Sequence, residues 1–95
     1  WRGGNEQPAI AMLTRAVELA PNAPAFHFDL GCMLLGLRRF TEAEPHLRTV
    51  VRLAPNERGG WNNLGALLVG QGKHEEAAAC FRRSFIGLLL RWKPL

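Results

Sequence analysis

The sequence predicts an all-α fold of antiparallel helix pairs stacked in a row, and three observations support it. First, Leu-Ala-Pro-Asn occurs twice, at residues 19–22 and 53–56, a spacing of 34 positions. Second, the same shift of 34 aligns further matches, and self-similarity at a fixed period of about 20–50 residues indicates a repeat array. Third, apolar residues recur at helical spacing, and no segment alternates with the period of two that strands show. The further matches include Leu30-Gly31 with Leu64-Gly65, and Glu42-Ala43 with Glu76-Ala77.

The first two helices are predicted by apolar residues three or four positions apart. Residues 6–20 have Ile10, Leu13 and Val17 on one face, and Pro21 ends this helix because proline cannot continue one. The second helix is expected over about residues 23–37. Its apolar face consists of Phe26, Leu30, Met33, Leu34 and Leu37.

The other three helices are predicted from the residues that cap or end them. Thr41 and Glu44 have the spacing of a capping box, so a third helix is expected from Thr41 to just before Pro55. The fourth covers about residues 58–69 and stops at Gly70-Gln71-Gly72, because glycine readily adopts left-handed backbone. The fifth covers about residues 74–90. In each Leu-Ala-Pro-Asn, Leu should pack inward, Pro should end the helix and Asn should cap the next one.

Composition is that of one small folded domain. Hydrophobic residues make up 47% of the 95 residues and charged residues 21%. The longest apolar run, residues 85–90, is far short of the ~20 residues that a membrane span requires. No signal-peptide pattern stands at the N-terminus, which leaves the compartment unknown with the cytoplasm favoured. Cys32 and Cys80 fall at unrelated places in the repeat, so free thiols are expected.

The positive charge of the chain does not by itself indicate nucleic-acid binding. The net charge is +4 and the pI is near 10. However, Arg38-Arg39 and Arg82-Arg83 are not joined by a wider basic run, and no aromatic residues interleave with them as base-stacking platforms would. A protein partner is therefore favoured over nucleic acid.

The periodic residues resemble the tetratricopeptide repeat family. Its pattern has a large residue, then Leu-Gly, then another large residue, and an Ala that opens the second helix of each pair. Two repeats and half of a third match this pattern. The last repeat supplies Trp61, Leu64-Gly65, Leu68, Ala77 and Phe81; the middle one His27, Leu30-Gly31, Leu34, Ala43, Leu47, Val50 and Pro55; and the first Ala9, Leu13, Ala16 and Pro21.

The resemblance implies a right-handed superhelical array of five helices in a single domain. Residues 5–23 would be the second helix of a partial first repeat, residues 24–57 the second repeat and residues 58–91 the third, followed by a tail at 92–95. Four positions depart from the pattern. His27 stands where an aromatic is usual, Val50 and Ser84 replace the second Ala, and Leu89 replaces the terminal Pro.

No set of residues predicts catalysis, a cofactor or a metal site. His27, His46 and His74 fall on three different helices or their starts, and no His-Cys or His-acid pair has metal-ligand spacing. His27 is interpreted as a core substitution. The glycines of Val-Gly-Gln-Gly-Lys lack the spacing of a phosphate loop. The sequence therefore predicts a protein that is not an enzyme within these residues.

The predicted function is partner binding on one face of the second and fourth helices. A step of 100° per residue places a small, apolar and nearly uncharged stripe on this face. In the resembling family this face lines a concave groove that holds a peptide or helix of a partner. Chaperone-tail binding is disfavoured, because Asn62 and Asn63 alone match its carboxylate-holding positions. The predicted groove residues are Ala25, Phe28, Cys32, Leu35, Asn62, Ala66 and Val69.

The predicted occupant of this groove is an apolar or amphipathic segment of about two or three helical turns. Phe28 and Leu35 should anchor it, and the binding should depend weakly on salt. Two alternatives stay open at this point. Neighbouring helices of the same chain could cover part of the stripe, and the array could be a fragment of a larger enzyme, for example a transferase, whose catalytic domain lies outside these residues.

Self-association through the chain ends is also predicted. The last helix has apolar residues on more than one side, which is typical of a helix that another surface covers. A homodimer or larger assembly with Ile86, Leu89 and Trp92 at the contact would cover it. The alternative is that other segments of a longer chain cover both ends.

Overall fold

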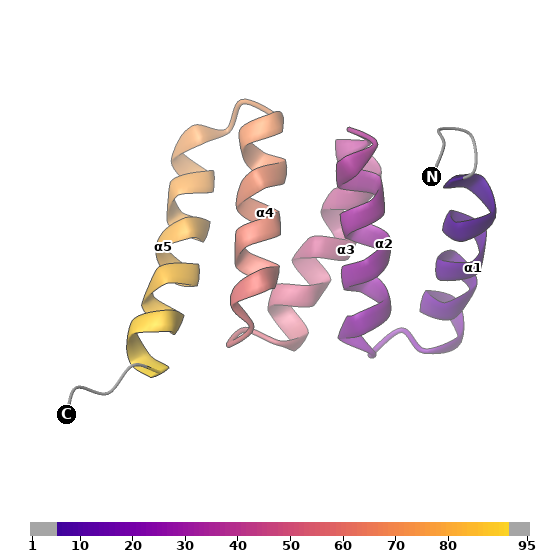
Figure 1. Ribbon diagram of the computed structural model, residues 1–95, viewed down its shortest axis with the longest axis horizontal. Coiled ribbons are helices and arrows are strands. Elements are labelled where there is room, and N and C mark those ends of the chain that lie inside the picture. Colours follow the sequence, from indigo (N-terminus) through magenta and orange to yellow (C-terminus); the bar gives the residue numbers. More distant parts are fainter. Residues whose placement is uncertain (1–5, 92–95) are drawn as a thin grey trace.

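The structure, a computed structural model, describes the backbone of residues 6–91 and the side chains of residues 6–85. These residues form five α-helices and no strand, as the sequence predicted. The helices are stacked along the long axis of the molecule, with α3 behind α2 in the view of Figure 1, and the described chain measures 47 × 29 × 24 Å. The helices are α1 (Glu6–Leu19), α2 (Pro24–Gly36), α3 (Phe40–Leu53), α4 (Arg58–Gly70) and α5 (His74–Arg91).

The helices pack in two tight pairs. The contacts of α2 with α3 and of α4 with α5 are the most extensive, whereas α1 with α2 and α3 with α4 touch less. Apart from these neighbours in sequence, α2 also contacts α4. Each pair is therefore a helical hairpin, and α3 joins the first hairpin to the second.

The buried core repeats with the period of 34. Leu30 and Leu34 of the first pair correspond to Leu64 and Leu68 of the second, and all four are nearly inaccessible to solvent. Because Leu, Leu and a small Ala occupy equivalent places in both hairpins, the core continues from one pair into the next. The core residues are Leu30, Leu34, Ala43, Leu47, Leu64, Leu67, Leu68, Ala77 and Cys80.

In both hairpins, a glycine allows the two helices to approach each other closely. A Cβ atom on Gly31 would lie 2.7 Å from Leu47 Cδ2, and one on Gly65 would lie 2.6 Å from Phe81 Cε1. Both distances are too short for real carbon atoms. The Gly of Leu-Gly is therefore required because the paired helix brings a large side chain against the helix backbone.

The two hairpin turns share one backbone conformation. Arg38 and Gly72 both have left-handed backbone, with φ of 61° and 78°. The Arg39 N–H donates to Leu34 O, and the Lys73 N–H donates to Leu68 O, as in a Schellman turn. The prediction of left-handed glycine is confirmed at Gly72.

Gly70 is helical instead of left-handed. It is the last residue of α4, where a Cβ would lie 2.5 Å from Phe40 Cζ. Its lack of a side chain therefore makes room for the Phe40 ring.

The predicted capping box at Thr41 and Glu44 is wrong. The helix α3 begins at Phe40, and its N-cap is Arg39, which makes no side-chain capping bond. The physical reason is the tight turn, because Arg39 both closes the end of α2 with its N–H and accepts from the Ala43 N–H with its carbonyl. Glu44 instead accepts hydrogen bonds from Arg48 and Gln71.

The N-cap positions of α2 and α4 are not the predicted asparagines. The N-cap positions of α2 and α4 are Ala23 and Glu57, one residue beyond each Asn of Leu-Ala-Pro-Asn, and neither makes a side-chain capping bond. Pro24 occupies the first turn of α2, where its missing N–H is not needed.

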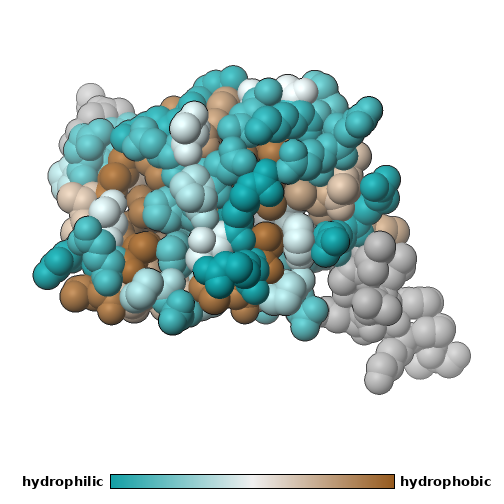
Figure 2. Space-filling view, turned by 180° about the vertical axis from the view of Figure 1, so that it is seen from behind, coloured by the Kyte–Doolittle hydropathy of each residue, from teal (hydrophilic) through white to brown (hydrophobic). Residues whose placement is uncertain are grey.

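An exposed ion-pair network joins the two hairpins on the side of α3. Arg48 donates to Glu44 on its own helix at 2.8 Å and to Glu76 of α5 at 2.6 Å. Figure 2 views the molecule from behind, and hydrophilic residues cover most of the middle of this face. Exposed hydrophobic residues are found on α1, where Met12 is 74% and Leu19 70% exposed.

Candidate partner-binding groove

The predicted groove residues lie on α2 and α4, and in Figure 1 α2 lies in front of α3. All seven are exposed or partly exposed. Near the middle of the stripe the two helices touch, since the Asn63 amide donates to the Cys32 Sγ at 3.0 Å. Neighbouring helices therefore cover part of Cys32, which was one of the alternatives left open by the sequence.

A hollow opens at one end of this stripe, between the first turns of α2 and α4 and above the end of α3. Its volume is about 470 Å³. Ala25 and Phe28 of the predicted stripe line it, but the other predicted residues do not. We call it the α2–α4 hollow. Its lining residues are Pro24, Ala25, Phe28, Asp29, Val50, Ala54, Glu57, Gly59 and Gly60.

Two adjacent glycines shape the floor and wall of the α2–α4 hollow. A Cβ on Gly60 would lie 2.9 Å from Val50 Cγ1, so α4 crosses α3 closely at this point. A Cβ on Gly59 would lie 3.4 Å from the Phe28 ring, and this ring lines the hollow. The result is a mainly apolar depression with one aromatic side chain in its wall.

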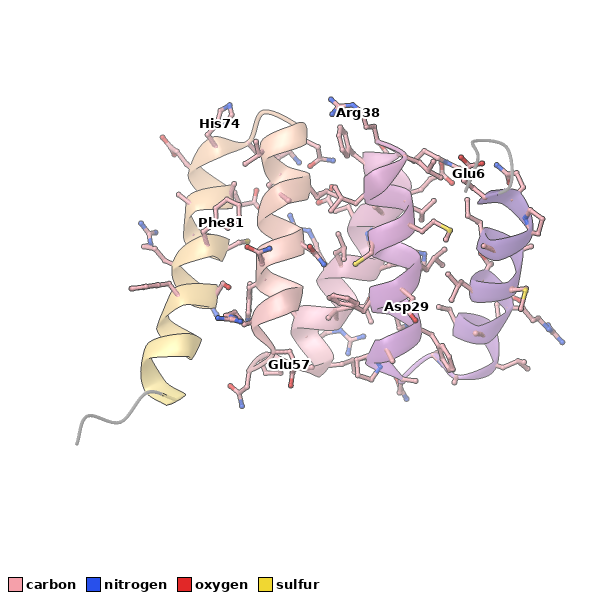
Figure 3. The ribbon with its side chains drawn as sticks, in the orientation of Figure 1. Glu6, Asp29, Arg38, Glu57, His74 and Phe81 are labelled. Atoms are coloured by element: carbon pink, nitrogen blue, oxygen red, sulfur yellow. The ribbon has the colours of Figure 1, made fainter. Side chains whose placement is uncertain are left out.

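Two carboxylates belong to the lining of this hollow. Asp29 and Glu57 are both exposed and lie toward the same end of the molecule, opposite Arg38 and His74 (Figure 3). Within residues 6–85, neither forms an ion pair. The expectation of a nearly uncharged stripe is therefore wrong at this end. Helical spacing from Phe28 predicted the exposed face of α2, but Asp29, the next residue of that helix, and Glu57, the N-cap of α4, also border the hollow.

Cys32 is a poor nucleophile in this setting. Burial raises the pKa of the Cys32 thiol, and the negative charge of Asp29 raises it further. Burial likewise raises the pKa of the Cys80 thiol. Both cysteines are free thiols, as expected from their placement in the repeat.

A second hollow continues the groove between α4 and α5, with a volume of about 500 Å³. Asn62 of the predicted stripe lies here, together with Arg58 and Ser84. Two aromatic rings also line it, and of these Phe81 is 38% and Phe85 58% exposed. The predicted stripe thus borders two separate depressions, while Leu35, Ala66 and Val69 line neither.

His27 is buried, as expected for a core substitution, and it contacts a second histidine. Its Nε2 lies 2.7 Å from the Pro21 carbonyl oxygen, and its Nδ1 lies 3.2 Å from His46 Nδ1. A carbonyl only accepts, so Nε2 of His27 carries a proton and donates it. In the neutral pair His27 Nδ1 then accepts from the His46 Nδ1–H. Over the described residues, no three His, Cys, Asp or Glu side chains are grouped as metal ligands would be.

None of the helices described is long and apolar enough to cross a membrane.

The fold and the groove define a solenoid of helical hairpins. Its open face is formed by α2 and α4, the first helix of each hairpin. The chain belongs to the tetratricopeptide repeat family, whose pattern matches residues 1–58 and again residues 28–85. No curated protein sequence matches the chain.

Solved structures of MamA proteins share this fold. The structure titled MamA MSR-1 C2 is 26% identical with a TM-score of 0.85, and the match covers 93% of this chain and 51% of that one. MamA AMB-1 is 27% identical with a TM-score of 0.83, covering 90% and 50%. A further MamA protein, with 18% identity and a TM-score of 0.84, covers 97% and 52% and is alike in fold alone. The chain thus spans about half the length of these proteins.

Proposed function

We propose that this chain is a non-catalytic scaffold that binds a peptide or helix of a partner protein in the groove along α2 and α4. The observation that carries the proposal is the α2–α4 hollow, where Phe28 faces an open, mainly apolar depression. A concave apolar site with a few polar groups at its edge is the usual form of a binding site. The predicted groove residues extend this surface along both helices, from Ala25 to Val69.

The alternative function is that of an array within a larger enzyme, such as a transferase. The length of the MamA neighbours, about twice the matched part, leaves room for additional segments in a related protein. The scaffold is favoured because nothing in the comparisons points to catalysis and both hollows suit a side chain of a polypeptide. Sequencing the complete reading frame distinguishes the two functions.

A charge placed in the groove tests the scaffold function. The double variant Phe28→Glu, Val69→Glu would put two carboxylates on the stripe, where they would disfavour an apolar segment. Proteins captured by the complete gene product and by this variant would be compared by quantitative mass spectrometry. We expect the variant to lose specific partners that wild type retains.

A matched control adds the same charge outside the groove. Thr14→Glu, Ala78→Glu changes two exposed residues of α1 and α5, and it should capture the same partners as wild type. Circular dichroism verifies that both variants fold. Identical partner sets for the groove variant and wild type would contradict the proposed function.

Self-association through Ile86, Leu89 and Trp92 remains a second proposal, and these side chains lie outside the described ones. It is favoured by the exposure of Met12, Leu19 and Phe85 at the two ends of the row. Light scattering at micromolar concentration tests it. A mass well above 10.6 kDa that Leu89→Glu lowers would support self-association. A mass near 10.6 kDa that is unchanged in Leu89→Glu would contradict it.

A further inference from the structure

The α2–α4 hollow has a definite chemical preference. Its lining combines the Phe28 ring and small apolar residues with the carboxylates of Asp29 and Glu57. These carboxylates form no ion pair within the described part of the chain, and the nearest basic residue in sequence, Arg58, lines the neighbouring hollow. A well-matched occupant therefore presents a large apolar side chain with a positive charge on each side.

The chain itself contains one segment of this kind. Residues 91–93 read Arg-Trp-Lys, with a leucine run before them and Pro94-Leu95 after them. Trp92 supplies a large apolar side chain, and Arg91 and Lys93 supply the two charges. Elsewhere in the sequence no aromatic residue stands directly between two basic ones.

We propose that the α2–α4 hollow of one copy binds the Arg91-Trp92-Lys93 segment of a second copy. Trp92 contacts Phe28 in the hollow, and Arg91 and Lys93 pair with Asp29 and Glu57. This proposal rests on the proposed function, since it uses the groove as the binding face, and it names the occupant of one end of that groove.

The arrangement of the helices favours a second copy over the same chain as the source of this segment. In Figure 1, α4 stands between α5 and α2, so α5 and the α2 side of the hollow lie on opposite sides of α4. A second copy can approach the open face directly. Each copy would offer one segment and one hollow, so the contact is heterologous and builds a ring or a chain of copies.

A synthetic peptide tests the contact directly. A fluorescent peptide of residues 89–95, Leu-Leu-Arg-Trp-Lys-Pro-Leu, would be titrated with the full chain and followed by fluorescence anisotropy. We expect saturable binding that weakens by about tenfold in Asp29→Lys, Glu57→Lys, because each exposed pair contributes little alone and reversal also adds repulsion. Binding should weaken from low to physiological salt, because these charges are screened.

Two controls isolate the charges of the hollow. Glu42→Lys, Glu75→Lys makes the same change in net charge in the first turns of α3 and α5, and it should leave the peptide affinity unchanged. These turns follow Arg38 and include His74, at the end of the molecule opposite Glu57 (Figure 3). A peptide in which Arg91 and Lys93 are replaced by Glu should bind at least about tenfold more weakly. Thermal melts verify that each protein variant is folded.

The outcomes separate this contact from the proposed function. Equal peptide affinity in wild type and in Asp29→Lys, Glu57→Lys, or no peptide binding at all, would overturn the contact between copies. The partner capture described above would still decide the scaffold function. Peptide binding that is lost in the hollow variant, with unchanged partner capture by Phe28→Glu, Val69→Glu, would support the contact and overturn the scaffold function.

Discussion

At the scale of single residues, the His27–His46 contact limits how many protons the core can hold. Nε2 of His27 is committed to the Pro21 carbonyl, and 3.2 Å separates the two Nδ1 atoms. One proton between these atoms makes a hydrogen bond, whereas two would bring N–H against N–H. Burial lowers the pKa of His46, and the charge of His27 lowers it further.

We predict that acid destabilises the fold through this pair. The pKa of His46 is lower in the folded chain than in the unfolded chain, so the unfolded chain binds more protons as the pH falls. The stability that His46 contributes is thus present above about pH 6.5 and is lost as the pH falls through the lowered pKa. Thermal melts between neutral and mildly acidic pH should show a falling Tm.

A neutral replacement tests the source of this pH dependence. Gln at position 46 can still donate to His27 Nδ1 but does not titrate, so His46→Gln should flatten the Tm profile. His74→Gln, at the exposed start of α5, serves as the control and should keep the wild-type profile. If the two variants give the same profile, the histidine pair is not the cause.

At the scale of elements, the two hairpins use the same turn with different residues. Gly72 adopts left-handed backbone without strain, but Arg38 has a Cβ that crowds the backbone there, at a cost of about 1–2 kcal/mol. Part of this cost is offset because the Arg38 guanidinium lies 5.1 Å from the centroid of the Phe40 ring. The first hairpin thus keeps its turn although it lacks the glycine that favours it.

Exchanging the turn residues should change stability in opposite directions. We predict that Arg38→Gly raises the free energy of unfolding by about 0.5–1 kcal/mol, because the loss of backbone strain exceeds the loss of the cation–π contact. Gly72→Arg should lower it by about 1–2 kcal/mol. Urea denaturation measures both. A drop in Arg38→Gly comparable to that in Gly72→Arg would show that the ring contact outweighs the strain.

Sequence periodicity predicted the helices, but it did not predict their capping residues or the acidic side of the hollow. The 34-residue period, the prolines and the glycines of the last turn placed the ends of all five helices to within about one residue, because core leucines and Leu-Gly contacts obey the same repeat. The capping residues were missed because the turn makes Arg39 the cap of α3. The acidic side of the hollow was missed because Asp29 of α2 and Glu57 before α4 come to line one depression only in the folded chain, and no periodic pattern reveals this.

At the scale of the whole molecule, the chain is a one-dimensional stack. Each helix packs against its neighbours in sequence, and within the described part of the chain α2 also packs against α4, while the Arg48–Glu76 ion pair links α3 to α5. Stability in such arrays is approximately the sum of the hairpins and the interfaces between neighbours. A buried residue in the second hairpin therefore affects both that hairpin and its interface with α3.

Truncating the core of the second hairpin should be costly. Leu64 is 1% exposed, so Leu64→Ala should lower the free energy of unfolding by about 2–5 kcal/mol. Arg58→Ala, at the exposed start of α4, should change it by less than about 0.5 kcal/mol. Equal thermal melts of the two variants would contradict the assignment of Leu64 to the core.

The ion-pair network of Arg48 has a consequence for engineering longer arrays. Arg82 stands one period after Arg48, and it is exposed on α5 with no ion pair in the described chain. A designed hairpin appended after α5 could reuse this bridge if its second helix carried a carboxylate at the place of Glu76. Ala78 stands one period after Glu44. The guanidinium of Arg82 would therefore have one carboxylate partner, whereas that of Arg48 has two, Glu44 and Glu76. Ala78→Glu would supply the second.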